Sequence, residues 1–119
     1  MPRRRVPDPL ALSVGRRIRQ LREEGGLTLE MLAFESDAPR GKKGFSKGHL
    51  SSIERGLVMP TIATLKVLAD RLGVLAADLV IDPDGGDRER IIDATRALTK
   101  GVLKKLAREL SEKKPSRSR

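Results

Sequence analysis

The chain has 119 residues and no cysteine, so it fits one small domain with extensions and excludes disulfides, thiol catalysis and cysteine-based zinc sites. Its 25 lysines and arginines against 16 acidic residues give a net charge of +9, which favours a polyanionic partner, either nucleic acid or an anionic membrane surface. Since no run of about 18 apolar residues is present and no long apolar stretch follows the basic N-terminus, we expect neither a transmembrane segment nor a signal peptide.

The first predicted helix follows a basic arm at residues 1–7. Asp8 can accept hydrogen bonds from the free N–H groups at the start of a helix, and Pro9 stands where no N–H is needed. Apolar residues at helical spacing follow, until Gly25 and Gly26 end the helix.

Two further helices are predicted on either side of a basic loop at 38–44. Thr28 is the expected N-cap of the second helix, which must end before Pro39 because the residue before a proline avoids helical backbone angles. Ser46 is the expected N-cap of the third helix, and Gly56, which tolerates left-handed backbone, is its expected end.

A fourth helix is predicted to open at Pro60 and Thr61, to present one apolar stripe and to close at Gly73. A short fifth helix is expected from Ala76 to Ile81. Residues 8–82 are therefore predicted to form an all-α domain of five short helices.

The C-terminal part begins with a turn-rich linker at 83–87. Beyond it, apolar residues recur at intervals of three and four, which predicts one amphipathic helix over 88–114 before a basic tail at 115–119. A helix so apolar on one side must pack on its own domain or on a second copy of the chain. The residues expected to mediate dimerisation are Ile91, Leu98, Val102, Leu106 and Leu110.

Three stretches, LTLEMLAFESD, SKGHLSSIERG and PTIATLKVLADRLGV, point to a known family. Together they closely resemble the Cro/phage-repressor (XRE) helix-turn-helix family, and the likeness covers residues 12–81. The resemblance implies a repressor-like domain that binds double-stranded DNA. Its second helix would cross the phosphate backbone, and its third, at 46–55, would enter the major groove.

The resemblance also implies individual roles. Leu50 and Ile53 would anchor the third helix from behind, and the small Ala33 would lie where the second and third helices cross. The family's base-reading positions fall on Lys47, Gly48 and Ser52. Lysine can donate to guanine O6 or N7, and serine can hydrogen-bond to either kind of base edge. Glycine has no side chain, so its backbone either approaches the DNA closely or contacts a thymine methyl group.

Phosphate contacts are expected from a second set of polar and basic residues. They are Ser46, His49, Ser51, Arg55, Thr61, Arg40, Lys42 and Lys43. Arg3, Arg4 and Arg5 resemble arms that enter the minor groove, although such a run is more often a solvated terminus with general DNA affinity.

Two departures from the family pattern affect the phosphate contacts. Leu29 stands where the family usually has a phosphate-binding glutamine, and residues 38–44 look like an insertion of seven residues. The basic side chains of the insertion either replace the lost phosphate contacts or form a solvated loop.

Catalysis finds no support in the sequence. There is one histidine and no Gly-x-Ser-x-Gly, Gly41-Lys42 lacks the flanking residues of a phosphate-binding loop, and the aspartates at 82–87 lack the glycine and glutamate of a calcium loop. We expect no enzyme activity, cofactor or metal.

The hypothesis is a cytoplasmic, nucleoid-associated transcriptional regulator: a homodimeric repressor that reads a palindromic site, with activation equally open to this fold. One alternative is an antitoxin-like or adaptor module that binds a partner protein through its C-terminal helix. Another is a nucleoid-type DNA binder of low specificity. A membrane partner is not expected.

Overall fold

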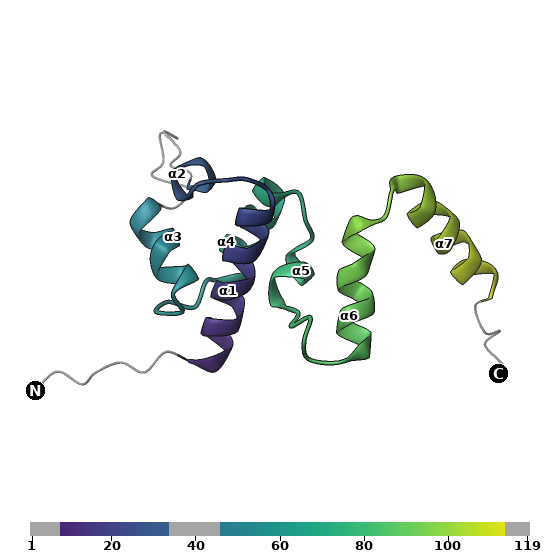
Figure 1. The fold of residues 1–119 in the computed structure, drawn as a ribbon, viewed down its shortest axis with the longest axis horizontal. Coiled ribbons are helices and arrows are strands. Elements are labelled where there is room, and N and C mark those ends of the chain that lie inside the picture. The colour runs from purple at the N-terminus through teal and green to yellow at the C-terminus, as the bar shows by residue number, and fades with distance from the viewer. Residues whose placement is uncertain (1–7, 34–45, 114–119) are drawn as a thin grey trace, which may run out of the picture. The chain divides into compact units, whose positions relative to one another are not determined.

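The computed structural model describes residues 8–33 and 46–113, which form helices and no strand. The chain divides into two compact units, residues 1–82 and residues 83–119. Figure 1 shows α1 to α5 in the first unit, and α6 and α7 in the second. Within the described ranges, no helix is long and apolar enough to cross a membrane.

The first unit begins with α1 (Pro9–Glu24), the longest helix of the described residues. The Asp8 carboxylate accepts a hydrogen bond from the backbone N–H of Leu10 at 2.7 Å, and the helix ends at Gly25. The predicted start and end of this helix are therefore confirmed.

The next three helices also begin at the predicted hydroxyl caps. Thr28 caps α2 (Leu29–Leu32), Ser46 caps α3 (Lys47–Glu54) and Thr61 caps α4 (Ile62–Leu72). In each case the side-chain oxygen accepts a hydrogen bond at 3.1 Å from the backbone N–H three residues later. Helix α5 (Ala76–Val80) completes the five predicted helices.

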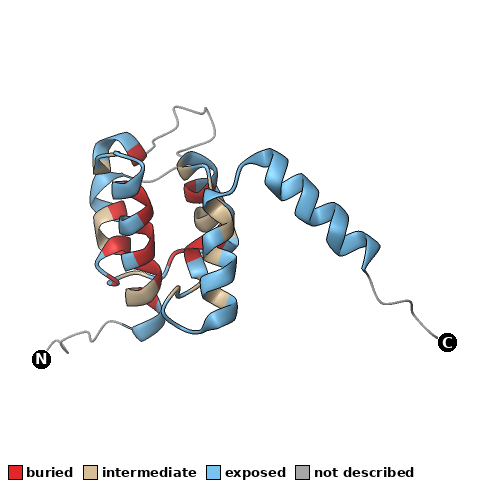
Figure 2. Ribbon diagram, turned by 45° about the vertical axis from the view of Figure 1, so that its right-hand side comes forward, coloured by how far each residue is buried: buried red, intermediate tan, exposed pale blue. Residues whose placement is uncertain are grey.

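Aliphatic side chains from all five helices form the core of the first unit. Figure 2 shows buried positions on these helices, whereas no residue of α6 or α7 is buried. The core consists of Val14, Ile18, Leu21, Leu32, Leu50, Ile53, Leu68, Ala69 and Leu79.

Two glycines allow close backbone approaches around α3. A Cβ atom added to Gly15 of α1 would lie 2.3 Å from the carbonyl oxygen of Ile53, so only glycine fits between these helices. Gly56 ends α3 with φ of +74°, and a Cβ there would lie 2.6 Å from Cδ2 of Leu12. The end of α3 therefore packs directly against α1.

The second unit corrects the prediction of one helix over 88–114. It contains α6 (Asp87–Ala94), a 3₁₀ turn at Thr95–Ala97 and α7 (Lys100–Glu112). Leu98 has extended backbone, and the Thr99 hydroxyl accepts a hydrogen bond from the N–H of Val102 at 3.3 Å. Because threonine caps a new helix more favourably than it continues one, the apolar repeat is divided between two helices.

Candidate nucleic-acid interface

Helix α3 has one buried face and one open face. Leu50 and Ile53 are fully buried, as expected for residues that anchor the helix. Lys47, Gly48 and His49 are exposed, and the serines at 51–52 are half-buried. The beginning of α3 therefore presents backbone and polar groups to solvent from a helix fixed on its other side.

A buried ion pair fixes the end of α3 to α1. The Arg22 guanidinium donates to both carboxylate oxygens of Glu54, from Nε at 2.7 Å and from Nη2 at 3.0 Å. The same guanidinium donates from Nη1 to the carbonyl oxygen of Leu27 at 2.8 Å. The side chains of Arg22 and Glu54 are only 11% and 6% exposed, and the hydrogen bond to Glu54 raises the pKa of Arg22.

Helix α2 is held at its C-terminal end by α4. Arg71 of α4 donates from Nε to the carbonyl oxygen of Leu32 at 2.9 Å and from Nη2 to that of Met31 at 2.8 Å. These carbonyls have no partner within the helix, since α2 ends there. The arginine therefore fixes a single helical turn that has little stability of its own.

An ion pair joins the beginnings of α2 and α3. The Lys47 ammonium contacts the Glu30 carboxylate, and both side chains remain more than half exposed, at 58% and 61%. The hydrogen bond from Lys47 is the main cause that lowers the pKa of Glu30. The lysine assigned to base reading therefore has an acidic partner, Glu30, which the sequence analysis did not identify.

The remaining candidate contacts take several positions in the first unit. The hydroxyls of Ser46 and Thr61 both serve as helix caps, and Thr61 also donates to the Thr64 hydroxyl at 3.0 Å. Arg55 is exposed, and its Nε contacts the Ser51 carbonyl at 3.4 Å. The other basic candidates lie outside the described residues: Arg3, Arg4, Arg5, Arg40, Lys42 and Lys43.

Comparisons with known proteins agree with this geometry. A profile of the helix-turn-helix family matches residues 18–79, which is more than half of the chain. Over 71 residues the chain is 44% identical to the HTH-type transcriptional regulator y4dJ of Sinorhizobium fredii, covering 60% of this chain and 83% of that protein. The chain belongs to the XRE-type helix-turn-helix family.

Two solved structures share the helical fold of this XRE-type protein. The clp gene regulator ClgR of Corynebacterium glutamicum aligns with a TM-score of 0.51 and 26% identity, over 93% of this chain and 100% of that chain. A chain of the SinR protein/SinI protein complex aligns with a TM-score of 0.54 and 28% identity, over 85% and 97%. The prediction of an all-α helix-turn-helix fold is confirmed.

Leu29, the first residue of α2, and Ala33, which directly follows the helix, both contribute to the core of this XRE-type protein. Leu29 is half-buried and packs against the core, so the position expected to bind phosphate adds to the hydrophobic interior instead. Ala33 also packs against the core, but its backbone is extended and lies beyond the end of the helix. Its place where the second and third helices cross stays a prediction.

Two of the four arginines of α1 are buried. Only Arg16 and Arg19 are exposed, whereas Arg17 and Arg22 are buried. Arg17 donates from Nε to the carbonyl oxygen of Asp78 at 2.7 Å, which ties α1 to α5. A buried arginine with its donors occupied serves packing rather than DNA contact.

Proposed function

We propose that the protein is a sequence-specific transcriptional regulator that inserts the beginning of α3 into the major groove of double-stranded DNA. The observation that carries the proposal is the open face of α3 at 47–49 on a helix whose other side is fixed by buried contacts. Base readout requires side chains held in a constant position relative to the duplex. The core side chains and the pair between Arg22 and Glu54 supply that rigidity.

In this proposal Lys47 and Ser52 read base edges, and Gly48 brings the backbone close to the groove. The phosphate contacts come from Ser46, His49, Ser51, Arg55, Thr61, Arg40, Lys42 and Lys43. The basic arm of Arg3, Arg4 and Arg5 enters the minor groove. The net charge of +9 favours these contacts electrostatically.

The experiment that tests the proposal is selection of bound duplexes from a random library at near-physiological salt, followed by sequencing. Enrichment of an inverted repeat, with half-sites about one helical turn apart, would support a dimeric sequence-reading regulator. If bound duplexes stay random while affinity depends strongly on salt, the protein is a low-specificity nucleoid-type binder and the proposal is wrong.

Replacing Lys47 with alanine should relax the preference at one base pair of the selected site, at a cost of about 1–3 kcal/mol in binding free energy. The matched control is Lys66→Ala, because Lys66 is also more than half exposed, at 65%, and pairs with Asp70 at 3.2 Å, on α4. Competition binding with single-base variants of the site measures both. Equal effects of the two substitutions would contradict the role assigned to Lys47.

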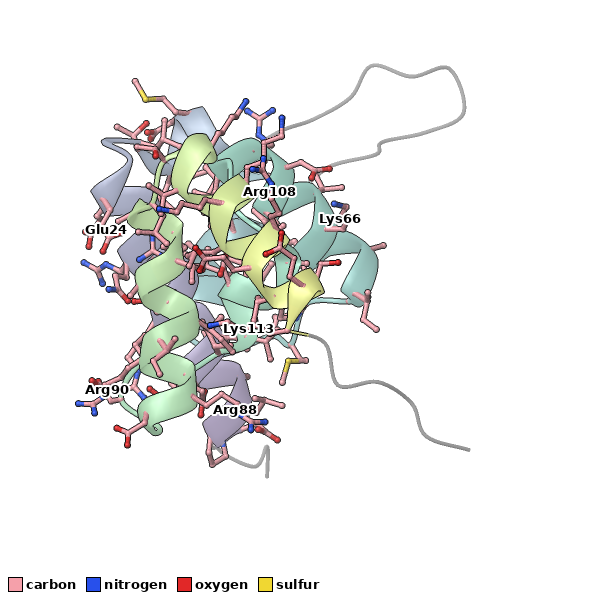
Figure 3. The ribbon with its side chains drawn as sticks, turned by 90° about the vertical axis from the view of Figure 1, so that its right-hand side faces the viewer. Glu24, Lys66, Arg88, Arg90, Arg108 and Lys113 are labelled. Carbon is pink, nitrogen blue, oxygen red and sulfur yellow. The ribbon has the colours of Figure 1, made fainter. Side chains whose placement is uncertain are left out.

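We also propose that the second unit joins two copies of the chain. Helix α7 carries Val102, Leu106 and Leu110 at four-residue spacing, with exposed fractions of 43%, 40% and 73%. Ile91 of α6 and Leu98 are exposed as well. Figure 3 shows charged residues in the same unit, with Arg88 and Arg90 near the start of α6, Arg108 on α7 and Lys113 directly after α7. A second copy would cover the apolar side and give the twofold symmetry that an inverted repeat requires.

Leu106→Glu should convert a dimer into a monomer, because a carboxylate in an apolar interface loses its hydration without gaining a partner. Ser111→Glu is the matched control, since the same helix gains the same charge at a polar position. Sedimentation equilibrium would give twice the chain mass of 13.1 kDa for the wild type and the control, and the chain mass for the variant. A wild type that sediments as a monomer contradicts the dimer but not DNA reading.

A second candidate is that another protein binds this unit, as in an adaptor or antitoxin-like module. The likeness to a chain of the SinR protein/SinI protein complex, which covers 85% of this chain, favours it. Copurification of a second chain that Leu106→Glu releases, together with a monomeric wild type, would support this candidate over the dimer.

A further inference from the structure

We propose that Glu30 is a specificity-determining residue of the DNA-reading surface, although it touches no base itself. Its carboxylate positions the Lys47 ammonium group to bind base edges and keeps that group away from phosphates. The inference rests on the proposed function of α3. It concerns the ion pair between α2 and α3, and it assigns a role to an acid on a surface that otherwise needs positive charge.

The ion pair joins a carboxylate that is held in place, that of Glu30, to the flexible side chain of Lys47. Glu30 belongs to the first turn of α2, where its own backbone N–H and the Thr28 hydroxyl also lower the pKa of its carboxyl group. It is therefore ionised at neutral pH and held close to the start of the helix. Lys47 is the first residue of α3, and its long side chain extends to this carboxylate. The position of the ammonium is thus set by α2.

The pair does little for folding. Both side chains are more than half exposed, and exposed ion pairs contribute little to stability because water and salt screen them. The effect of the pair is therefore expected in DNA binding rather than in the free energy of unfolding.

The chemistry of the pair favours bases over phosphates. An ammonium group has three N–H donors, so one can stay on Glu30 while the others reach guanine O6 and N7. A lysine without such a partner is a mobile point charge that binds any phosphate within reach. The Glu30 carboxylate repels phosphate oxygens, so it weakens binding to all duplexes. The loss of affinity is smallest for duplexes in which Lys47 hydrogen-bonds to a guanine.

The test measures dissociation constants for a selected site and for a random duplex with wild type, Glu30→Gln, Lys47→Ala and the double variant. Glutamine keeps the size of the side chain and removes its charge. Glu23→Gln is the matched control, because Glu23 is 56% exposed and pairs with Arg19 at 3.5 Å, on α1. All variants are compared at one ionic strength, and thermal melting verifies that each is folded.

Glu30→Gln is expected to reduce the ratio of specific to random affinity about tenfold, mainly through tighter binding of the random duplex. The control should leave the ratio unchanged, and Glu30→Gln in the Lys47→Ala background should leave it unchanged too. Two results would contradict the inference but not the proposed function. In the first, the wild type prefers the selected site and Glu30→Gln has the same ratio of specific to random affinity. In the second, Glu30→Gln lowers that ratio equally in the Lys47→Ala background. If the wild type does not discriminate at all, the proposed function fails and the inference fails with it.

Discussion

Replacing Arg22 with alanine should lower the free energy of unfolding by about 3–5 kcal/mol, a large part of the stability of a small domain. The substitution leaves the Glu54 carboxylate buried, with its side chain 6% exposed and both strong hydrogen bonds removed. It also removes the donor to the Leu27 carbonyl. Urea unfolding of the full chain, followed by circular dichroism, measures the loss.

The control for Arg22 lies on the same helix. Arg19 pairs with Glu23 at 3.5 Å, but these side chains are 62% and 56% exposed, so Arg19→Ala should change stability by less than about 1 kcal/mol. A double variant, Arg22→Met with Glu54→Leu, should recover much of the loss, because no buried charge is left without a partner. An equal effect of Arg19→Ala and Arg22→Ala would contradict the structural role of the buried pair.

Gly15→Ala should destabilise the protein by about 2–3 kcal/mol, although alanine is normally the better residue inside a helix by roughly 0.5–1 kcal/mol. The reversal follows from the two backbone oxygens beside it. An added Cβ would lie 2.3 Å from the carbonyl oxygen of Ile53 and 2.6 Å from that of Glu54. Neither oxygen belongs to a flexible side chain, so α3 has to move away from α1.

Gly48→Ala is the matched control for this prediction, since the nearest atom to its added Cβ, the Ser46 hydroxyl oxygen, is 3.9 Å away. This variant should be as stable as the wild type or slightly more stable. Unfolding of both variants by urea checks the difference. If Gly15→Ala behaves like Gly48→Ala, the close packing of α1 against α3 is not a constraint on the fold.

Features that depend on neighbouring residues could be predicted from the sequence. The caps at Asp8, Thr28, Ser46 and Thr61 involve hydrogen bonds that reach only two or three residues along the chain, so composition near a helix start suffices. The same holds for the glycine that ends α4, Gly73, with its φ of +73°.

Features that join distant segments could not be predicted in this way. Arg22 and Glu54 are 32 positions apart, and no local pattern separates this arginine from the exposed Arg19 on the same helix. The close approach of α3 to Gly15 could not be predicted either, because the sequence around a glycine inside a helix does not indicate that carbonyl groups of another helix lie beside it. Each depends on how α1 lies against α3.

The candidate site shows the same division. The resemblance assigned Lys47 to base reading from its place in the motif, and the exposure of Lys47 agrees with a surface role. Its pairing with Glu30 depends on the approach of α2 to α3 and was missed. In the second unit, the end of α6 could not be predicted from the apolar spacing of three and four residues, because Thr95 and Thr99 also fit a helical repeat.

The hydrogen bonds from Arg71 to the end of α2 affect whether the DNA-reading motif can keep its structure outside this domain. A helix of four residues does not persist alone in water, and the donors that fix its last carbonyls come from residue 71, outside the motif. A peptide of residues 28–56, or a graft of that segment onto another scaffold, would therefore lose the orientation of α2 and the place of Glu30 beside Lys47. A graft that preserves this recognition surface therefore has to include α4.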